Sequence, residues 1–185
     1  MKTGLILVDI QNDYFPGGKM ELKGMAAAAE NAAKLLDLFR TNKWPSFHIQ
    51  HISNYEGAAF FLPATKGVEL HQRIAPLPEE TVIQKNFPNS FRDTGLLDAL
   101  KAAAIERVVI CGAMSHMCID ATTRAAADLG FTCVLIHDAC ATRDLVFEGK
   151  TVKAADVHAS FMAALGSAYA QVEGCGEFVS GVESQ

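Results

Sequence analysis

The sequence predicts an α/β fold, a three-layer α/β/α sandwich with a doubly wound, mainly parallel six-stranded sheet of the Rossmann-like type. Two observations carry this prediction. Short runs of branched apolar residues alternate along the chain with longer segments whose apolar residues recur at helical spacing. The short runs are apolar on both faces, which is typical of parallel strands covered by helices on both sides. For six strands joined by helical crossovers, the expected strand order is 3-2-1-4-5-6.

The strands are expected where branched apolar residues cluster. The run Gly4-Leu5-Ile6-Leu7-Val8 is the first, Pro45 precedes the second, and Gly112 is expected to end the fourth. A short strand near the end of the chain would close the sheet. In chain order, the predicted strands occupy residues 4–8, 46–52, 81–84, 107–111, 131–136 and 171–173.

The helices are expected in the segments between these strands. The first is rich in Ala and Leu, the second has Thr94 as its predicted N-cap, and Gly130 is expected to end the third. The predicted helices occupy residues 25–41, 94–104, 115–129 and 151–169. The segment 53–80 has no clear element, and a loop of this length is typical of a lid or binding loop. We expect the whole chain, 1–185, to form a single domain.

Composition restricts the classes of function. Of the 185 residues, 50% are hydrophobic and the formal net charge is only −5, with Lys and Arg scattered along the chain. A nucleic-acid binder would need a basic stripe, so this class is excluded. No apolar stretch is long enough for a signal peptide or a membrane span. The five cysteines show no metal-binding or redox spacing, so we expect a cytoplasmic protein with free thiols and no cofactor.

Three reactive side chains lie at one edge of the predicted sheet. Ligands of doubly wound sheets bind beyond the carboxyl ends of the strands at the switch point, here between the first and fourth strands. Asp9 directly follows the first strand, Lys85 ends the third, and Cys118 lies near the start of the helix after the fourth. The helix dipole and the Lys85 ammonium would favour a thiolate at Cys118. Asp9 could accept the thiol proton and later return it to a leaving amine.

Other interpretations of these residues compete with catalysis. A single Cys is more often a buried small hydrophobic residue, an Asp after a strand usually caps a turn, and a Lys there is usually solvated. A dinucleotide site is not indicated, because the turn after the first strand lacks the glycine-rich pattern. Two further alternatives are a catalytically silent scaffold and a redox-active thiol protein. For the latter, the sequence assigns no resolving cysteine, because it does not show whether the Cys111 side chain faces Cys118.

Three segments together resemble a known family. The stretches LILVDIQNDYF, VIQKNFPNSF and VVICGAMSHMCIDATTRAAADLGF, the last followed by HDAC, are similar to the isochorismatase-like cysteine hydrolases. That family includes nicotinamidases, carbamoyl-amide hydrolases and isochorismatases. The resemblance implies a catalytic triad of Asp9, Lys85 and Cys118. It also implies a cis peptide bond between Ala113 and Met114, with the backbone N–H groups of Met114 and Cys118 forming an oxyanion hole.

The resemblance does not extend to the nicotinamidase metal site. In nicotinamidases an Asp and two His bind a metal after the second strand, whereas this chain has His48-Ile49-Gln50-His51 there and no acidic ligand. His48 and His51 lie three residues apart, which on a strand places them on opposite faces. We therefore predict no metal site, with His51 as a hydrogen-bonding group of the pocket and His48 as a core residue.

The predicted function is cysteine-dependent hydrolysis of a C–N bond (amide, ureido or lactam) in a small molecule, through a thioester. The alternative within the family is vinyl-ether hydrolysis of the isochorismatase type, which the presence of Cys118 makes less favoured. The resemblance also implies a homo-oligomer. Nine residues are expected to surround the substrate: Gln11, Tyr14, Phe15, His51, Phe60, Phe61, Asn89, Phe91 and His116.

Overall fold

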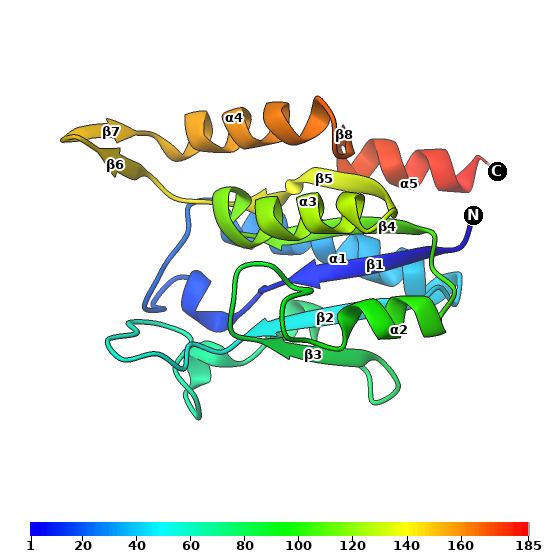
Figure 1. The fold of residues 1–185 in the computed structure, drawn as a ribbon, viewed down its shortest axis with the longest axis horizontal. Coiled ribbons are helices and arrows are strands. Elements are labelled where there is room, and N and C mark those ends of the chain that lie inside the picture. Colours follow the sequence, from blue (N-terminus) through cyan, green and yellow to red (C-terminus); the bar gives the residue numbers. More distant parts are fainter. Residues whose placement is uncertain (185) are drawn as a thin grey trace.

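The computed structural model describes residues 1–184, and its central sheet confirms the predicted fold class. Six parallel strands lie in the order β3-β2-β1-β4-β5-β8 (Figure 1). This is the predicted order, with β8 in the sixth place. The strands of this sheet are β1 (Thr3–Val8), β2 (Ser46–His51), β3 (Thr81–Lys85), β4 (Arg107–Ala113), β5 (Thr132–Ala141) and β8 (Gln171–Glu173).

Helices cover both faces of the sheet (Figure 1). Along β1, Leu5 and Leu7 are buried in one apolar cluster, whereas Ile6 and Val8 are buried in the other. Because successive side chains of a strand point to opposite faces, the central strands have no solvated side. One cluster is shared with α1 (Met25–Thr41) and α5 (Cys175–Glu183); the other with α2 (Leu96–Ala102), α3 (Asp120–Asp128) and α4 (Ala154–Gly166).

The fourth strand is longer than predicted. Gly112 does not end β4, which continues to Ala113, because Gly112 has a φ of 125° and no Cβ. A Cβ at this position would lie 1.9 Å from the carbonyl oxygen of Val8. Glycine therefore allows β4 to pass the end of β1 at close range and to continue toward the following turn.

The helix predicted for residues 115–129 has two parts. Its first turn, Ser115–Ile119 (labelled η4), is π-helical, and the regular helix α3 begins only at Asp120. Cys118 therefore lies in a widened turn before the α-helix. Single π-helical turns occur frequently at functional sites.

The second half of the chain differs from the prediction in a hairpin and in three helices. A two-stranded hairpin, β6 (Leu145–Phe147) and β7 (Lys150–Val152), projects from the body of the fold (Figure 1). Helix α4 begins after this hairpin, so the predicted helix 151–169 started too early, and a further helix, α5, follows β8.

Helix α2 begins at Leu96 after Gly95, so Thr94 is not the N-cap, although its hydroxyl accepts a hydrogen bond from the Leu96 N–H at 3.3 Å.

The segment 53–80 is ordered around two short 3₁₀ turns, Lys66–Val68 and Gln72–Ile74. Its main anchor is the buried carboxylate of Asp13, which accepts a hydrogen bond from the Phe61 N–H at 2.6 Å. Gly67 packs directly against this carboxylate, because a Cβ there would lie 2.1 Å from Asp13 Oδ1. The anchored segment thus forms one wall of the edge where β1, β2 and β3 end. Within residues 1–184, no helix is long and apolar enough to cross a membrane.

Candidate active site

Asp9, Lys85 and Cys118 come together at the carboxyl edge of the sheet. Asp9 follows β1 with a φ of 52°, a left-handed backbone conformation that ends the strand. Lys85 is the last residue of β3, and Cys118 lies in the turn after β4. All three side chains are buried. The three residues predicted at the switch point therefore meet at a single place.

The Lys85 ammonium is surrounded by acceptors. Its Nζ lies 2.8 Å from Asp9 Oδ2 and 3.2 Å from His51 Nδ1, and it donates to the carbonyl oxygens of Phe87 (3.1 Å) and Pro88 (3.2 Å). Burial lowers the pKa of Lys85, but the charge and hydrogen-bond interactions with Asp9 and Cys118 together outweigh burial and raise it. The ammonium therefore stays charged and holds the Asp9 carboxylate in place.

The surroundings of Cys118 favour the neutral thiol, whereas the sequence favoured a thiolate. Burial raises the pKa of Cys118, and the nearby Asp9 carboxylate raises it further, while Lys85 lowers it. The sulfur, one Asp9 oxygen and one His51 nitrogen all lie within 4.8 Å of one another. The thiol therefore needs a base to remove its proton, and the Asp9 carboxylate is adjacent to it.

The peptide bond between Ala113 and Met114 is cis. It stands between the end of β4 and the π-helical turn that contains Cys118. The carbonyl oxygen of Met114 accepts hydrogen bonds from the N–H groups of Met117 (3.0 Å) and Ile119 (3.2 Å). These contacts fix the backbone of the turn on both sides of Cys118.

His51 is held beside the three residues by Gln11. The Gln11 side chain accepts from the His51 N–H at 2.7 Å and donates to the His51 carbonyl at 2.9 Å. Its Nε2 also donates to the carbonyl of Val68 at 2.7 Å. Burial lowers the pKa of His51, Asp9 raises it and Lys85 lowers it, with a net lowering. Since an ammonium only donates, His51 Nδ1 accepts from Lys85, and the ring proton is on Nε2.

A cavity of about 170 Å³ opens onto the Cys118 sulfur. Three predicted substrate-binding residues line it: Tyr14, His51 and Phe60. The Tyr14 ring packs against Phe60 and Phe61 at centroid distances of 5.9 and 4.6 Å. Burial, Cys118 and Asp9 raise the pKa of Tyr14, so its hydroxyl remains protonated. The remaining lining residues are Ser53, Tyr55, Asn86, Pro88, Met114, Met117 and Cys118.

Three predicted substrate-binding residues support the loop around the cavity instead of lining it. Gln11 is fully buried, and its amide is committed to the backbone of His51 and Val68. Phe61 is fully buried behind Tyr14 and His51. Phe15 stacks on His71 at a centroid distance of 3.6 Å, in a separate surface hollow.

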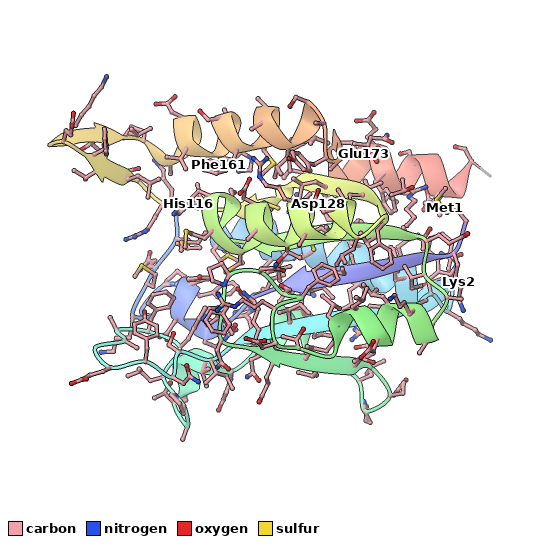
Figure 2. The ribbon with its side chains drawn as sticks, in the orientation of Figure 1. Met1, Lys2, His116, Asp128, Phe161 and Glu173 are labelled. Atoms are coloured by element: carbon pink, nitrogen blue, oxygen red, sulfur yellow. The ribbon has the colours of Figure 1, made fainter. Side chains whose placement is uncertain are left out.

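Three further predicted residues lie outside the cavity. The Asn89 side chain accepts a hydrogen bond from the Phe91 N–H at 2.9 Å and so closes a turn. Phe91 packs against Phe131, with the ring centroids 6.3 Å apart. His116 contacts Thr142 at 2.6 Å and lies beside Phe161, on the α4 side of the molecule (Figure 2).

Sequence reasoning missed five lining residues, although a signal existed for some of them. Ser53 and Tyr55 follow β2, and Asn86 and Pro88 follow β3, so all four leave the same edge of the sheet as Asp9. Met117 directly precedes the nucleophile candidate. Asp9 and Lys85 were selected because they lie at the end of a strand. The same criterion would also have selected Asn86.

The donor set Asp9, His51 and Cys118 has the spacing of a possible metal site. Oxygen, nitrogen and sulfur ligands of this kind suit Zn²⁺. However, the Lys85 ammonium already occupies the space between two of these donors, 2.8 Å from the Asp9 oxygen and 3.2 Å from the His51 nitrogen. A metal cation bound there would meet a buried like charge, so this arrangement favours proton transfer over metal binding.

Comparisons with a family model, with known proteins and with solved structures all point to one family. The isochorismatase domain model matches residues 3–166. The uncharacterized isochorismatase family protein YddQ of Bacillus subtilis is 52% identical over 94% of this chain and 96% of its own length. A solved structure from Oleispira antarctica, assigned to the isochorismatase hydrolases, is 50% identical, has a TM-score of 0.93, and covers 97% of this chain and 96% of its own.

A relative with a named activity is more distant. Streptothricin hydrolase of Streptomyces noursei is 37% identical over 76% of this chain, and this chain spans only 50% of that protein. The domain match covers most of the chain, and the fold, the strand order and the similarity to YddQ agree with it. The chain therefore belongs to the isochorismatase family of hydrolases.

Proposed function

We propose that this protein hydrolyses a C–N bond of a small amide, ureido or lactam substrate, with Cys118 as the nucleophile. The observation that carries the proposal is the convergence of an acid-base group, a charged lysine and a thiol at the floor of one small cavity. Asp9 Oδ2 lies 2.8 Å from Lys85 Nζ, and the Cys118 sulfur lies within 4.8 Å of Asp9. A metal ion is not required in this scheme.

The first step moves the thiol proton to Asp9 as the sulfur attacks the substrate carbonyl. The raised pKa of Cys118, caused mainly by burial, favours a proton transfer that is coupled to the attack. Lys85 pairs with the Asp9 carboxylate before the transfer and stabilises the thiolate during it. Because the Lys85 ammonium is already held between fixed acceptors, it needs little reorganisation when the proton is transferred.

The attack gives a tetrahedral oxyanion, for which the backbone N–H groups of Met114 and Cys118 are the proposed donors. Each such donor typically contributes about 3 kcal/mol to the stabilisation of a transition state. Asp9 then gives its proton to the departing nitrogen, the C–N bond breaks, and an acyl thioester remains on Cys118. The leaving group is ammonia or an amine.

Water completes the cycle. Asp9 removes a proton from the water, which attacks the thioester carbonyl, and the C–S bond breaks. The sulfur recovers a proton, and the product leaves as a carboxylic acid, or as a carbamic acid if the substrate was a ureide. Enzyme and proton balance are restored without an oxidant or reductant.

Ammonia release tests the proposal directly. A panel of small primary amides, ureides and lactams (ring opening followed by mass spectrometry) would be incubated with the native protein, with Cys118→Ala and with Cys133→Ala. Cys133 is a matched control, since it is also a buried thiol but lies on β5 and lines no part of the cavity. We expect activity in the native and Cys133→Ala proteins, none in Cys118→Ala, and no loss on treatment with a chelator.

Other outcomes would favour the alternatives. Equal activity in Cys118→Ala would refute the nucleophile assignment. Absence of C–N hydrolysis with cleavage of a vinyl ether would favour the isochorismatase-type reaction. Reversible peroxide oxidation without hydrolysis would favour the redox role, but Cys111 is no resolving partner for Cys118, because the two side chains are buried in different cores on opposite faces of the sheet. Homo-oligomerisation and a cytoplasmic location remain predictions, the former testable by light scattering.

A further inference from the structure

The cavity at Cys118 is lined without a positively charged group that could bind an anionic substrate. We infer that this site selects uncharged small amides and excludes substrates that carry a carboxylate beside the scissile bond. This inference rests on the proposed function and specifies its substrate class. It depends on three features of the site: the lining of the cavity, the contacts of Lys85 and the donors that face the cavity.

None of the described residues that line the cavity is Arg or Lys. Enzymes and receptors that bind carboxylates usually supply an Arg fork or a Lys ammonium for them. The lining here consists of aromatic and Met side chains with a few neutral polar groups. A carboxylate in this cavity would lose part of its hydration without gaining an ion pair, which is unfavourable.

Lys85 is the nearest cation, but its protons are already committed. An ammonium has three N–H donors, and four acceptors from Asp9, His51, Phe87 and Pro88 lie between 2.8 and 3.2 Å from Nζ. Its side chain has no exposed surface. Lys85 can therefore stabilise the Asp9 carboxylate and the Cys118 sulfur, but it has no free donor for a substrate.

The charge distribution at the floor of the cavity also disfavours a second anion. An Asp9 oxygen lies within 4.8 Å of the Cys118 sulfur, and burial together with this carboxylate raises the pKa of the thiol, whereas Lys85 lowers it. A substrate carboxylate bound near Cys118 would be repelled by Asp9. A neutral carbonyl avoids this repulsion and acquires charge only when the backbone donors can receive it.

The neutral groups that face the cavity suit carbonyl oxygens. His51 Nε2 carries the ring proton because Nδ1 faces the Lys85 ammonium, and the His51 ring lines the cavity. The Tyr14 hydroxyl, kept protonated by burial, is a second donor. Asn86 donates one N–H to the Ile52 carbonyl at 2.8 Å, which leaves its other amide hydrogen and its oxygen for a ligand. A substrate with a second amide group would match these partners.

Arg143 is the alternative source of positive charge near the cavity. It is exposed and does not line the cavity, but its positive charge lowers the pKa of both Tyr14 and His116. Its side chain could reach toward the cavity entrance and bind a carboxylate there. The two possibilities differ in their prediction for an Arg143→Gln variant, which would remove carboxylate binding only if Arg143 supplied it.

Matched substrate pairs test the inference, because an amide and a carboxylate have the same shape and differ in charge. Succinamide would be compared with succinamate, and phthalamide with phthalamate. Binding to Cys118→Ala would be measured by ligand-detected NMR and calorimetry, and turnover by ammonia release from the native protein. We expect the neutral member of at least one pair to bind at least tenfold more tightly than its acid, and an unchanged ratio in Arg143→Gln.

The two readouts separate this inference from the proposed function. Preferential binding of the diamide without turnover by the native protein would support the inference and refute the hydrolytic proposal. Equal or tighter binding of the acid, or no binding of any neutral member, would overturn the inference. A preference for the acid that disappears in Arg143→Gln would assign the anion site to Arg143.

A gain-of-function variant gives an independent check. Tyr55 lines the cavity entrance and is 59% exposed, so Tyr55→Arg adds a cation there without disturbing the core. We expect this variant to bind succinamate at least fivefold more tightly than the parent protein, with Tyr55→Gln as the neutral control. If Tyr55→Arg bound succinamate no more tightly than the parent protein, the absence of a cation would not be the cause of the selectivity.

Discussion

Lys85 and Asp9 form a fully buried ion pair, with Nζ 2.8 Å from Oδ2 and neither side chain exposed to solvent. They come from strands that are not neighbours, since β2 separates β1 from β3 in the sheet. Burial of two charges is costly unless each charge is matched. The pair therefore links the stability of the sheet edge to the chemistry of the site.

Removal of one partner of this pair should destabilise the fold strongly. Lys85→Met leaves the Asp9 carboxylate buried without its cation, so we expect unfolding to become easier by about 3–5 kcal/mol. The double variant Asp9→Asn/Lys85→Met should recover much of this loss, because no unpaired charge remains. Urea unfolding followed by circular dichroism measures both values. Similar stability of the single and double variants would contradict a dominant charge effect.

Asp9→Asn should separate thiol reactivity from catalysis. Loss of the carboxylate removes the proton acceptor, so hydrolysis should fall by about 10²–10⁴-fold. The same change removes a group that raises the pKa of Cys118, so iodoacetamide should alkylate Cys118 faster at pH 7.5 than in the native protein. Peptide mass spectrometry would give the rate at each cysteine. Slower alkylation of Cys118 in the variant would show that Asp9 activates the resting thiol.

Gly112→Ala should disrupt the junction of β1 and β4. The added Cβ would lie 1.9 Å from the Val8 carbonyl oxygen, and the φ of 125° is unfavourable for alanine. We expect a loss of at least about 3 kcal/mol in unfolding free energy. Gly130→Ala is the matched control, since Gly130 also has a positive φ but nothing lies within 4 Å of its Cβ. That control should lose only about 1–2 kcal/mol, and equal effects of the two substitutions would argue against the steric explanation.

Acidification should destabilise the protein at a pH where carboxylates are still ionised. Burial lowers the pKa of His48 and His51 from 6.5 in the folded state, so the unfolded chain binds more protons as the pH falls below 6.5. Burial opposes ionisation of Glu80, yet hydrogen bonds from Arg40 and Leu77 lower its pKa to about 2. The contribution of Glu80 to folding stability is therefore lost only as the pH falls below 4.5. Between pH 6.5 and 5 the histidines therefore lower the stability before the contribution of Glu80 is lost. Calorimetry should show a falling Tm across this interval and a smaller fall in His48→Gln; an unchanged slope would exclude His48.

The sequence was sufficient for the central sheet and for the three reactive residues. Branched apolar runs identify strands that are buried on both faces, and right-handed crossovers restrict the strand order. Once the order is known, a residue directly after a strand must lie at the carboxyl edge of the sheet. Asp9 and Lys85 could be placed in this way because no turn separates them from their strands.

Substrate-binding residues were harder to predict, because their orientation depends on turns. Gln11 lies only two residues beyond Asp9, yet its amide turns toward the backbone of His51. Asn89 binds its own turn, and this places Phe91 against Phe131. In such short loops a single change of φ redirects every following side chain, and sequence spacing does not record it.

Two missed elements have opposite explanations. The hairpin of β6 and β7 had a partial signal, because Gly149 follows the apolar run Leu145-Val146-Phe147; in the structure, Glu148 and Gly149 form a two-residue turn with both φ values positive. Helix α5 had none, because Gly176 and Gly181 give it low helix propensity. Packing of Phe178 on Phe39, with ring centroids 6.4 Å apart, helps to hold that helix.

The position of β1 has a consequence for how the chain folds during synthesis. Leu5 pairs with Ser46 on one side and with Val109 on the other, so β1 lacks one neighbour until β4 has been translated. Contacts between such distant segments slow folding, and the apolar edge of β1 stays open to wrong partners in the meantime. Ribosome-bound fragments that end before β4 should therefore be protease-sensitive and prone to chaperone binding, whereas fragments that extend beyond β5 should become protected.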